Sequence, residues 1–206
     1  MRGRRWPVGF MIETAKLNAL RLQMAQCEQA RFHSVLQHGE LVWQRFQELV
    51  HLMESGNPRL YPFKQPDWLW LYRDELLDHL LPVHTMERYM VYHDCGKPYC
   101  RAVDDQGKVH FPNHEVISAR TWLDLGGAAD EAELMLHDMH MHTMAADEVP
   151  EFIRLKGAPT LMLSSLAEVH ANAELFGGMS TVSFQAKWKH IDRRGTLACK
   201  LLWGSR

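Results

Sequence analysis

HSVLQHGELVWQRFQELVHLMES, residues 33–55, is the stretch that decides the fold class. Its apolar residues recur at helical rather than strand spacing. From His38, offsets of 4, 8, 11 and 15 lead to Val42, Phe46, Leu49 and Met53. This is the spacing of one helical face turned toward a core. Gly56, Asn57 and Pro58 follow as breakers, so the stretch predicts one long amphipathic helix with a histidine on its buried face.

Helical patterns continue on both sides of this stretch. Residues 12–31 are rich in Ala, Leu, Gln and Met, which favour helices. Asp67 and Asn113 are candidate N-caps. Further helices are expected at 68–81, 84–94, 114–125, 130–145, 148–156, 159–176 and 182–192, with a short apolar run at 197–203.

One segment departs from the helical pattern. Residues 98–113 are expected to form an irregular excursion or a short hairpin around 105–107. No strand pattern is strong enough to build a sheet. We therefore expect an all-α fold, with a single helical-bundle domain over 11–206 and a loose arm over 1–10.

Composition and charge are those of an ordinary globular protein. The chain has 206 residues, of which 46% are hydrophobic and 23% charged, and its length suits one domain. The net charge of −2 points to neither nucleic acid nor an acidic membrane surface. No run approaches the roughly 20 apolar residues that a membrane span needs. The cysteines lack C-x-x-C spacing and are expected as reduced thiols of a cytoplasmic protein: Cys27, Cys95, Cys100 and Cys199.

Histidine is the outlier, with 13 residues, and the hexapeptide HDCGKP at 93–98 concentrates the chemistry. An adjacent His and Asp offer a borderline nitrogen ligand and a hard oxygen ligand, which suits divalent Mn, Fe, Zn or Mg. Both can reach one ion only where a helix end leaves room, and Gly96 and Pro98 supply that end. Lys97 is then a candidate phosphate clamp. The alternative is a surface His-Asp pair at a helix end.

This hexapeptide resembles the H-D-x-G-K-P signature of the HD-domain metal-dependent phosphohydrolases. Motifs spread over roughly residues 33–176 carry the likeness. The segment HEVISA at 114–119 looks like the H-E-x-x-(S/G)-A segment of the tRNA-nucleotidyltransferase branch. Members are all-helical and gather an H…HD…D ligand set around one metal. The resemblance therefore implies one or two divalent ions as cofactor (Mn, Fe, Zn, Mg, Ni or Co).

The resemblance also assigns ligands to the first ion. Its upstream histidine must come from the helix over 33–55, and we choose His38, on the buried stripe, over His33. A core histidine without a metal is the alternative for His38. Glu168 stands in a Leu-Ala-Glu frame where the family has Asp. Glu can still coordinate, directly or through water, but the departure leaves metal identity and reaction type open. The implied set is His38, His93, Asp94 and Glu168.

Many members hold a second ion through two intervening histidines. His114, in the first turn of its helix, would be one of them, or would contact phosphate. His137 and His140 are three residues apart and share a helical face, whereas His142 is expected to point elsewhere. We choose His140 as the second ligand, with His137 in reserve. The alternative is that these histidines face solvent and have no role.

The function implied is a phosphomonoesterase or phosphodiesterase that attacks a nucleotide or a nucleic-acid-end phosphate with metal-activated water. Asp94 would orient the water and Lys97 would neutralise the phosphoryl group. Lys187, Arg193 and Arg194 could bind substrate phosphate or form a solvated basic end. The alternatives are a non-catalytic nucleotide-binding HD module and a di-iron HD oxygenase.

Two expectations concern partners. A small phosphorylated substrate, in the first place a nucleotide, is expected, with an RNA end as the second candidate and no membrane partner. Oligomeric state is open, and a dimer is one option.

The aromatic cluster Trp68, Trp70 and Tyr72 could be core, dimer surface or a base-stacking platform, in that order.

Overall fold

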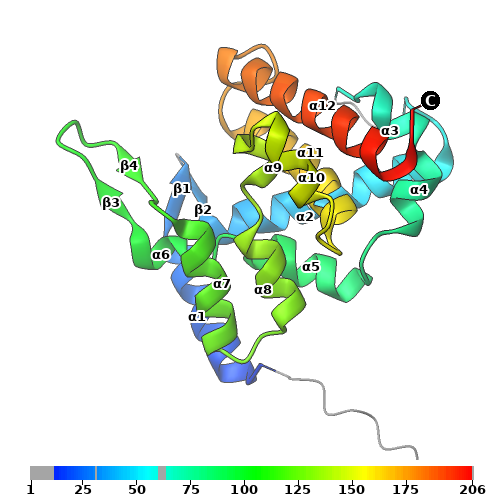
Figure 1. Ribbon diagram of the computed structural model, residues 1–206. Coiled ribbons are helices and arrows are strands. Elements are labelled where there is room, and N and C mark those ends of the chain that lie inside the picture. Colours follow the sequence, from blue (N-terminus) through cyan, green and yellow to red (C-terminus); the bar gives the residue numbers. More distant parts are fainter. Residues whose placement is uncertain (1–11, 31, 60–63, 206) are drawn as a thin grey trace, which may run out of the picture.

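The computed structural model describes residues 12–30, 32–59 and 64–205, which are mainly helical (Figure 1). Its helices are α1 (Thr14–Gln26), α2 (Val35–Ser55), α3 (Asp67–Leu71), α4 (Arg73–Asp78), α5 (Val83–Tyr92), α6 (Lys97–Cys100), α7 (His114–Asp124), α8 (Ala129–Leu136), α9 (His140–Thr143), the 3-10 turn η1 (Ala146–Glu148), α10 (Val149–Phe152), α11 (Ala158–Leu175) and α12 (Val182–Trp203). The strands pair in two small antiparallel hairpins, β1 (Glu28–Ala30) with β2 (His33–Ser34) and β3 (Ala102–Val103) with β4 (Val109–His110).

This architecture confirms the all-α prediction. The hairpin expected around 105–107 is also confirmed. Strands β3 and β4 pair on either side of these turn residues and project from the helical body (Figure 1). The arm predicted over 1–10 lies outside the described residues. Among the described residues, no helix has the length and apolar character needed to cross a membrane.

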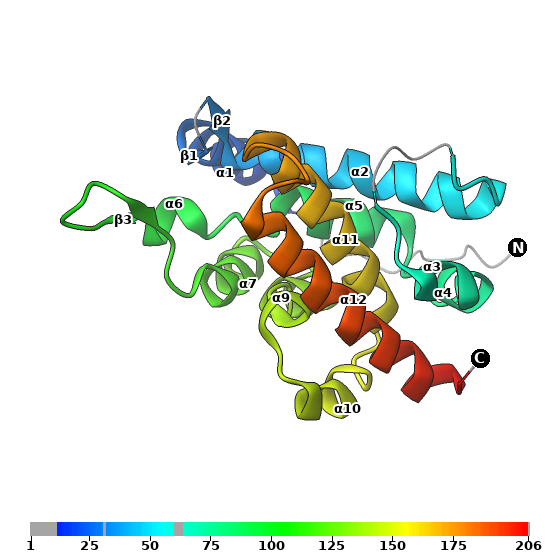
Figure 2. The same cartoon turned by 90° about the horizontal axis from the view of Figure 1, so that it is seen from above.

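Helix α2 is the element around which the bundle is built. It packs against α11 and α5, while α12 lies on the outer side of α11 (Figure 2). Its buried face carries the predicted stripe, and His38 is buried with it. Ser34 and Gln37 form a capping box at its start, and Gly56 ends it in the left-handed region with φ 65°.

A close approach between α2 and α5 occurs at Gly39. A Cβ at this position would lie 2.2 Å from the carbonyl oxygen of Val91, so only glycine fits. Gly39 follows His38 directly, and Val91 lies two residues before His93. The crossing therefore brings the two histidines together.

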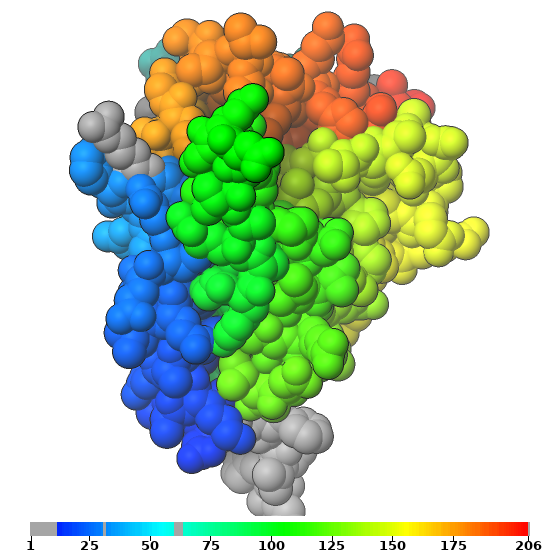
Figure 3. Space-filling view, turned by 90° about the vertical axis from the view of Figure 1, so that its left-hand side faces the viewer, coloured from blue at the N-terminus to red at the C-terminus, as the bar shows by residue number. Residues whose placement is uncertain are grey.

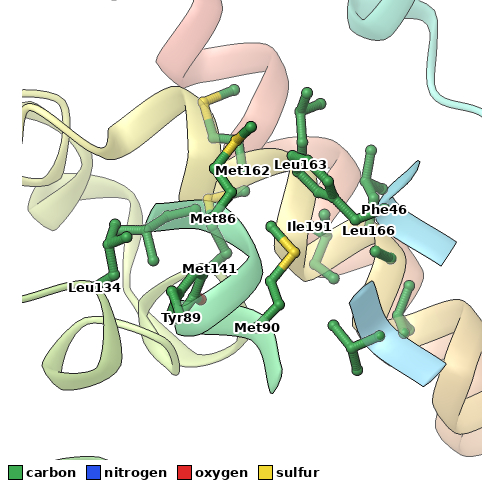
Figure 4. Packing of buried hydrophobic residues seen from close by; sticks show 14 of the residues in the cluster. Phe46, Met86, Tyr89, Met90, Leu134, Met141, Met162, Leu163, Leu166 and Ile191 are labelled. Carbon is green, nitrogen blue, oxygen red and sulfur yellow. The ribbon is translucent and has the colours of Figure 1, made fainter. Parts of the chain in front are cut away.

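The core between α5, α9 and α11 is rich in methionine. Figure 4 shows Met86 and Met90 of α5 near Met141 of α9 and Met162 of α11. Flexible, polarisable methionines fill the irregular gaps where short helices meet. Elsewhere Trp68 and Tyr72 are buried, which confirms the core interpretation for them, and Trp70 is half-buried.

Two predicted helix boundaries are wrong because a short hairpin replaces helix between them. The helix expected over 12–31 ends at Gln26, and the helix expected from 33 begins at Val35. Between them, Glu28 pairs with Ser34 in the β1–β2 hairpin. Apolar periodicity carries no signal for so short a pair of strands.

The helix predicted over 130–145 is interrupted. Helix α8 ends at Leu136 and α9 begins at His140, with a turn over 137–139. Within this turn the Asp138 side chain is buried and bonded to Tyr89, a contact between distant segments. The break changes which histidines share a face.

The remaining differences are local. The helix predicted over 68–81 is split at Tyr72, and Asp67 is the first residue of α3 rather than its cap. Asn113 occupies the N-cap position of α7 but makes no side-chain cap bond. The helix predicted over 148–156 spans only α10, preceded by η1. The apolar run at 197–203 is the last part of α12.

Candidate metal centre

His93 is the first residue after α5, and Asp94 follows it. This is the helix end that we predicted from Gly96 and Pro98. Both side chains are buried. Gly96 lets this turn pack against α7, since a Cβ there would lie 2.4 Å from the backbone nitrogen of Ser118. His93 Nδ1 lies 2.7 Å from the carbonyl oxygen of Met90. A proton on Nδ1 donates to that carbonyl and leaves Nε2 as the ring's potential ligand atom.

Three side chains from distant parts of the sequence converge at this point. His38 of α2, His93 and Glu168 of α11 each offer a ligand atom, and these atoms all lie within 4.8 Å of one another. Among the described residues, neither ring nitrogen of the buried His38 has a hydrogen-bond partner, and neither does Nε2 of His93. Unsatisfied buried polar groups cost about 1–3 kcal/mol each. This cluster could therefore hold a metal ion, which would satisfy them.

Asp94 lies beside the same histidines. Its Oδ2 is 3.2 Å from His93 Nε2 and 3.8 Å from His38 Nε2, and it accepts a 2.6 Å bond from Lys97 Nζ. Its Oδ1 is buried, has no hydrogen-bond partner in the part of the chain that the structure describes, and lies 3.5 Å from His114 Nε2. Asp94 is thus surrounded by cationic or potentially cationic groups.

Burial and charge set the protonation of this cluster. Burial would raise the pKa of Asp94, but His93 and Lys97 hold that pKa well below its usual value. Burial lowers the pKa of His38 to about 4, which leaves its ring neutral and able to coordinate at neutral pH. Burial would also lower the pKa of His93, but Asp94 and Asp138 raise it to about 10. Metal binding would therefore displace a proton from His93.

Glu168 is held by two neighbours. Its Oε2 lies 2.8 Å from His142 Nε2, and its Oε1 accepts a 3.2 Å bond from Asn172 Nδ2. Burial would raise the pKa of Glu168, but His142 keeps it well below its usual value, so the group is a carboxylate. The expectation that His142 points away is wrong.

His137 and His140 are placed elsewhere. Their rings contact each other, with His137 Nδ1 3.4 Å from His140 Nε2, and His140 also stacks on Phe152. Both line a separate pocket with Asp147, Glu148 and Glu151. The turn over 137–139 explains the difference, because the prediction assumed one continuous helix. The structure thus brings His142, and not His140, to Glu168.

A buried network around Asp138 was not predicted from the sequence. Tyr89 donates a 2.5 Å bond to Asp138 Oδ1 and lies 3.1 Å from Ser164 Oγ. These residues join α5, the 137–139 turn and α11 behind His93. Burial raises the pKa of Asp138. No local signal could have identified Asp138, because nothing in the pattern marks the turn that buries it.

A pocket of about 260 Å³ opens beside the cluster. Figure 3 shows the face from which the β3–β4 hairpin (green) projects, with α1 in blue on one side and the α11–α12 region in orange above. The residues that line the pocket come from β1, α6, the start of α7, the 137–139 turn and the α11–α12 region. Its lining includes Gln29, Lys97, His114, Glu168, Asn172, Phe176, Ser183 and Lys187.

The predicted substrate-binding residues are separated by the structure. Lys187 lines the pocket. Arg193 is exposed on α12 away from it, and Arg194 donates a 2.9 Å bond to the carbonyl oxygen of Met144. Residues six apart on a helix differ by about 240° in direction, which turns Arg193 away from the face of Lys187. The basic cluster expected from the sequence is therefore not one surface.

Comparisons with known proteins leave the family open: no protein-family model, curated protein or solved structure matches the chain. The fold and the site nonetheless define a class. The chain is an all-α protein with a buried His/Glu cluster that could hold a metal ion, beside a pocket with two lysines. Its function has to be argued from that chemistry.

Proposed function

We propose that the chain is a metal-dependent phosphohydrolase of the HD type, acting on a nucleotide or nucleic-acid-end phosphate ester. One observation carries the proposal. His38, His93 and Glu168, assigned as ligands from the sequence pattern and the resemblance, lie with their ligand atoms within 4.8 Å of one another. Asp94, the second residue of the motif, lies next to both histidines. Residues so far apart in sequence have no local reason to converge.

The donor set fits a divalent transition metal. A set of two imidazole nitrogens and two carboxylates suits Mn, Fe, Co, Ni or Zn better than a set made of oxygen ligands alone would. His38 supports this choice, because its two ring nitrogens are buried and have no hydrogen-bond partner among the residues described. A bound divalent ion would lower the pKa of a coordinated water and polarise phosphate oxygens.

The surrounding side chains have separate tasks. Asp94 Oδ1 makes no hydrogen bond to the described residues and can accept a hydrogen bond from an attacking water, which would orient that water. Lys97 lines the pocket and places its ammonium 2.6 Å from Asp94 Oδ2, where it can neutralise charge on a phosphoryl group. His114 lines the same pocket and faces Asp94 Oδ1. It can donate to a phosphate oxygen or help to hold a second ion.

The test begins with the wild-type protein. Metal content is measured by mass spectrometry, and p-nitrophenol release is followed from mono- and bis-p-nitrophenyl phosphate. We expect bound metal and turnover of one of the two esters, and the preferred ester separates a monoesterase from a diesterase. Failure to bind metal under any loading condition would refute the proposal.

Two other results would replace the proposal with its alternatives. Bound iron with oxygen consumption and no ester hydrolysis would favour a di-iron oxygenase. Nucleotide binding without metal or hydrolysis would favour a non-catalytic binding module.

Lys187→Ala is expected to raise KM for a phosphate substrate about 5-fold while leaving kcat nearly unchanged. Lys187 lines the pocket but is exposed, so its attraction for a phosphate is partly screened and worth roughly 1 kcal/mol. Lys189→Ala is the matched control, because Lys189 is an exposed lysine on the same helix outside the pocket lining. Steady-state kinetics measures both. Equal effects of the two variants would remove Lys187 from the substrate site.

A further inference from the structure

Glu168 needs external support if it is to act as a metal ligand. The resemblance predicts Asp at this position, and Glu has one more rotatable bond than Asp. The Glu168 carboxylate can therefore adopt more conformations. Two contacts restrict it, one to His142 and one to Asn172. Asn172 lies one turn further along α11, whereas His142 comes from α9. The His142 contact therefore fixes Glu168 against a different element.

His142 is itself held firmly. Only 3% of its side chain is exposed. The end of α9 is tied to α12, because Arg194 donates to the carbonyl oxygen of Met144, two residues after His142. Burying an imidazole without partners is costly, and Glu168 supplies the hydrogen bond that Nε2 of His142 makes.

The contacts of His142 distinguish it from the ligand cluster. The ligand atoms within 4.8 Å of one another belong to His38, His93 and Glu168, and His142 is not in this group. Its Nε2 is directed at Glu168 Oε2, and its buried Nδ1 has no hydrogen-bond partner over 12–30, 32–59 and 64–205. His142 thus reaches the cluster through Glu168.

We propose that His142 is a positioning residue that holds the Glu168 carboxylate in place for metal binding. The inference rests on the proposed metal site and adds a residue that the sequence pattern excluded. Outer partners that orient a ligating carboxylate typically contribute about 10–100-fold to metal affinity. Loss of the His142 contact lets Glu168 rotate away from His38 and His93 and weakens binding by that factor.

The experiment measures Mn²⁺ affinity of the full chain by the EPR signal of the free ion. His142→Leu removes the contact, and His142→Gln retains an N–H donor at nearly the same reach. We expect about 10–100-fold weaker binding for His142→Leu and a much smaller loss for His142→Gln. In a Glu168→Gln background, His142→Leu should cause no further loss, because its effect is transmitted through that carboxylate. Circular dichroism and thermal unfolding confirm that each variant folds.

Two results would overturn the proposal. Equal losses for His142→Leu and His142→Gln would show that the N–H donor does not matter. A further loss in the Glu168→Gln background would show that His142 acts independently of Glu168. If His142→Leu fails to fold, His142→Asn is used in its place. The asparagine amide is shorter than that of glutamine and cannot reach Glu168, so the comparison with His142→Gln still holds.

The outcomes separate this inference from the proposed function. A wild type that binds Mn²⁺, loses affinity as expected in His142→Leu and hydrolyses no phosphate ester contradicts the hydrolase proposal alone. A wild type that hydrolyses an ester while His142→Leu keeps full Mn²⁺ affinity contradicts the positioning role alone. If the wild type has no affinity for Mn²⁺, the proposal that His142 holds Glu168 in place to bind this ion is contradicted.

Discussion

His93→Ala and Asp94→Ala should each lose bound metal and ester hydrolysis together. His93 contributes a ligand atom to the cluster, and Asp94 lies 3.2 Å from it while also pairing with Lys97. Loss of a direct ligand should exceed the roughly 10–100-fold loss of affinity that follows removal of an outer partner. Metal analysis after dialysis and p-nitrophenol release measure the two properties on the same samples.

His38→Ala and His33→Ala provide a matched pair for the same prediction. His38 is buried in the cluster, whereas His33 is exposed on β2. His38→Ala should weaken metal binding, and His33→Ala should leave it unchanged. Should the His93 and Asp94 variants retain both metal and activity, the ion lies elsewhere and the site assignment is wrong.

Gly39→Ala should destabilise the protein by about 2–3 kcal/mol, although alanine favours helix by roughly 1 kcal/mol over glycine. The added Cβ would meet backbone atoms of α5, with Val91 O at 2.2 Å and Met90 O at 3.1 Å. Backbone of a packed helix cannot move aside as a side chain can, so α2 and α5 must separate. Urea denaturation measures the free energy of unfolding.

The same substitution should weaken metal binding, because the α2–α5 crossing sets the distance between His38 and His93. Gln44→Ala is the control, since Gln44 is exposed on the same helix, and its effect should stay within about 0.5 kcal/mol. An unchanged or higher stability in Gly39→Ala would mean that the two helices are less tightly packed than the structure indicates.

Local sequence patterns determined the helical class and part of the site. The stripe through Val42 and Phe46 lies on the buried face of α2, and it correctly favoured burial of His38 over His33. The helix end before Gly96 and the hairpin around 105–107 were also predicted. These features depend on periodicity, breakers and turn residues, which act within one or two turns of chain.

Tertiary structure alone decided which histidine bonds to the Glu168 carboxylate. The turn over 137–139 brings His142 to that carboxylate and leaves His140 against Phe152. Asp138 is buried because Tyr89, 49 residues away in the chain, bonds to it. Likewise Lys187 reaches the pocket and Arg193 does not, because packing fixes the rotation of α12. Such choices depend on contacts between distant segments, and no pattern within a single segment encodes them.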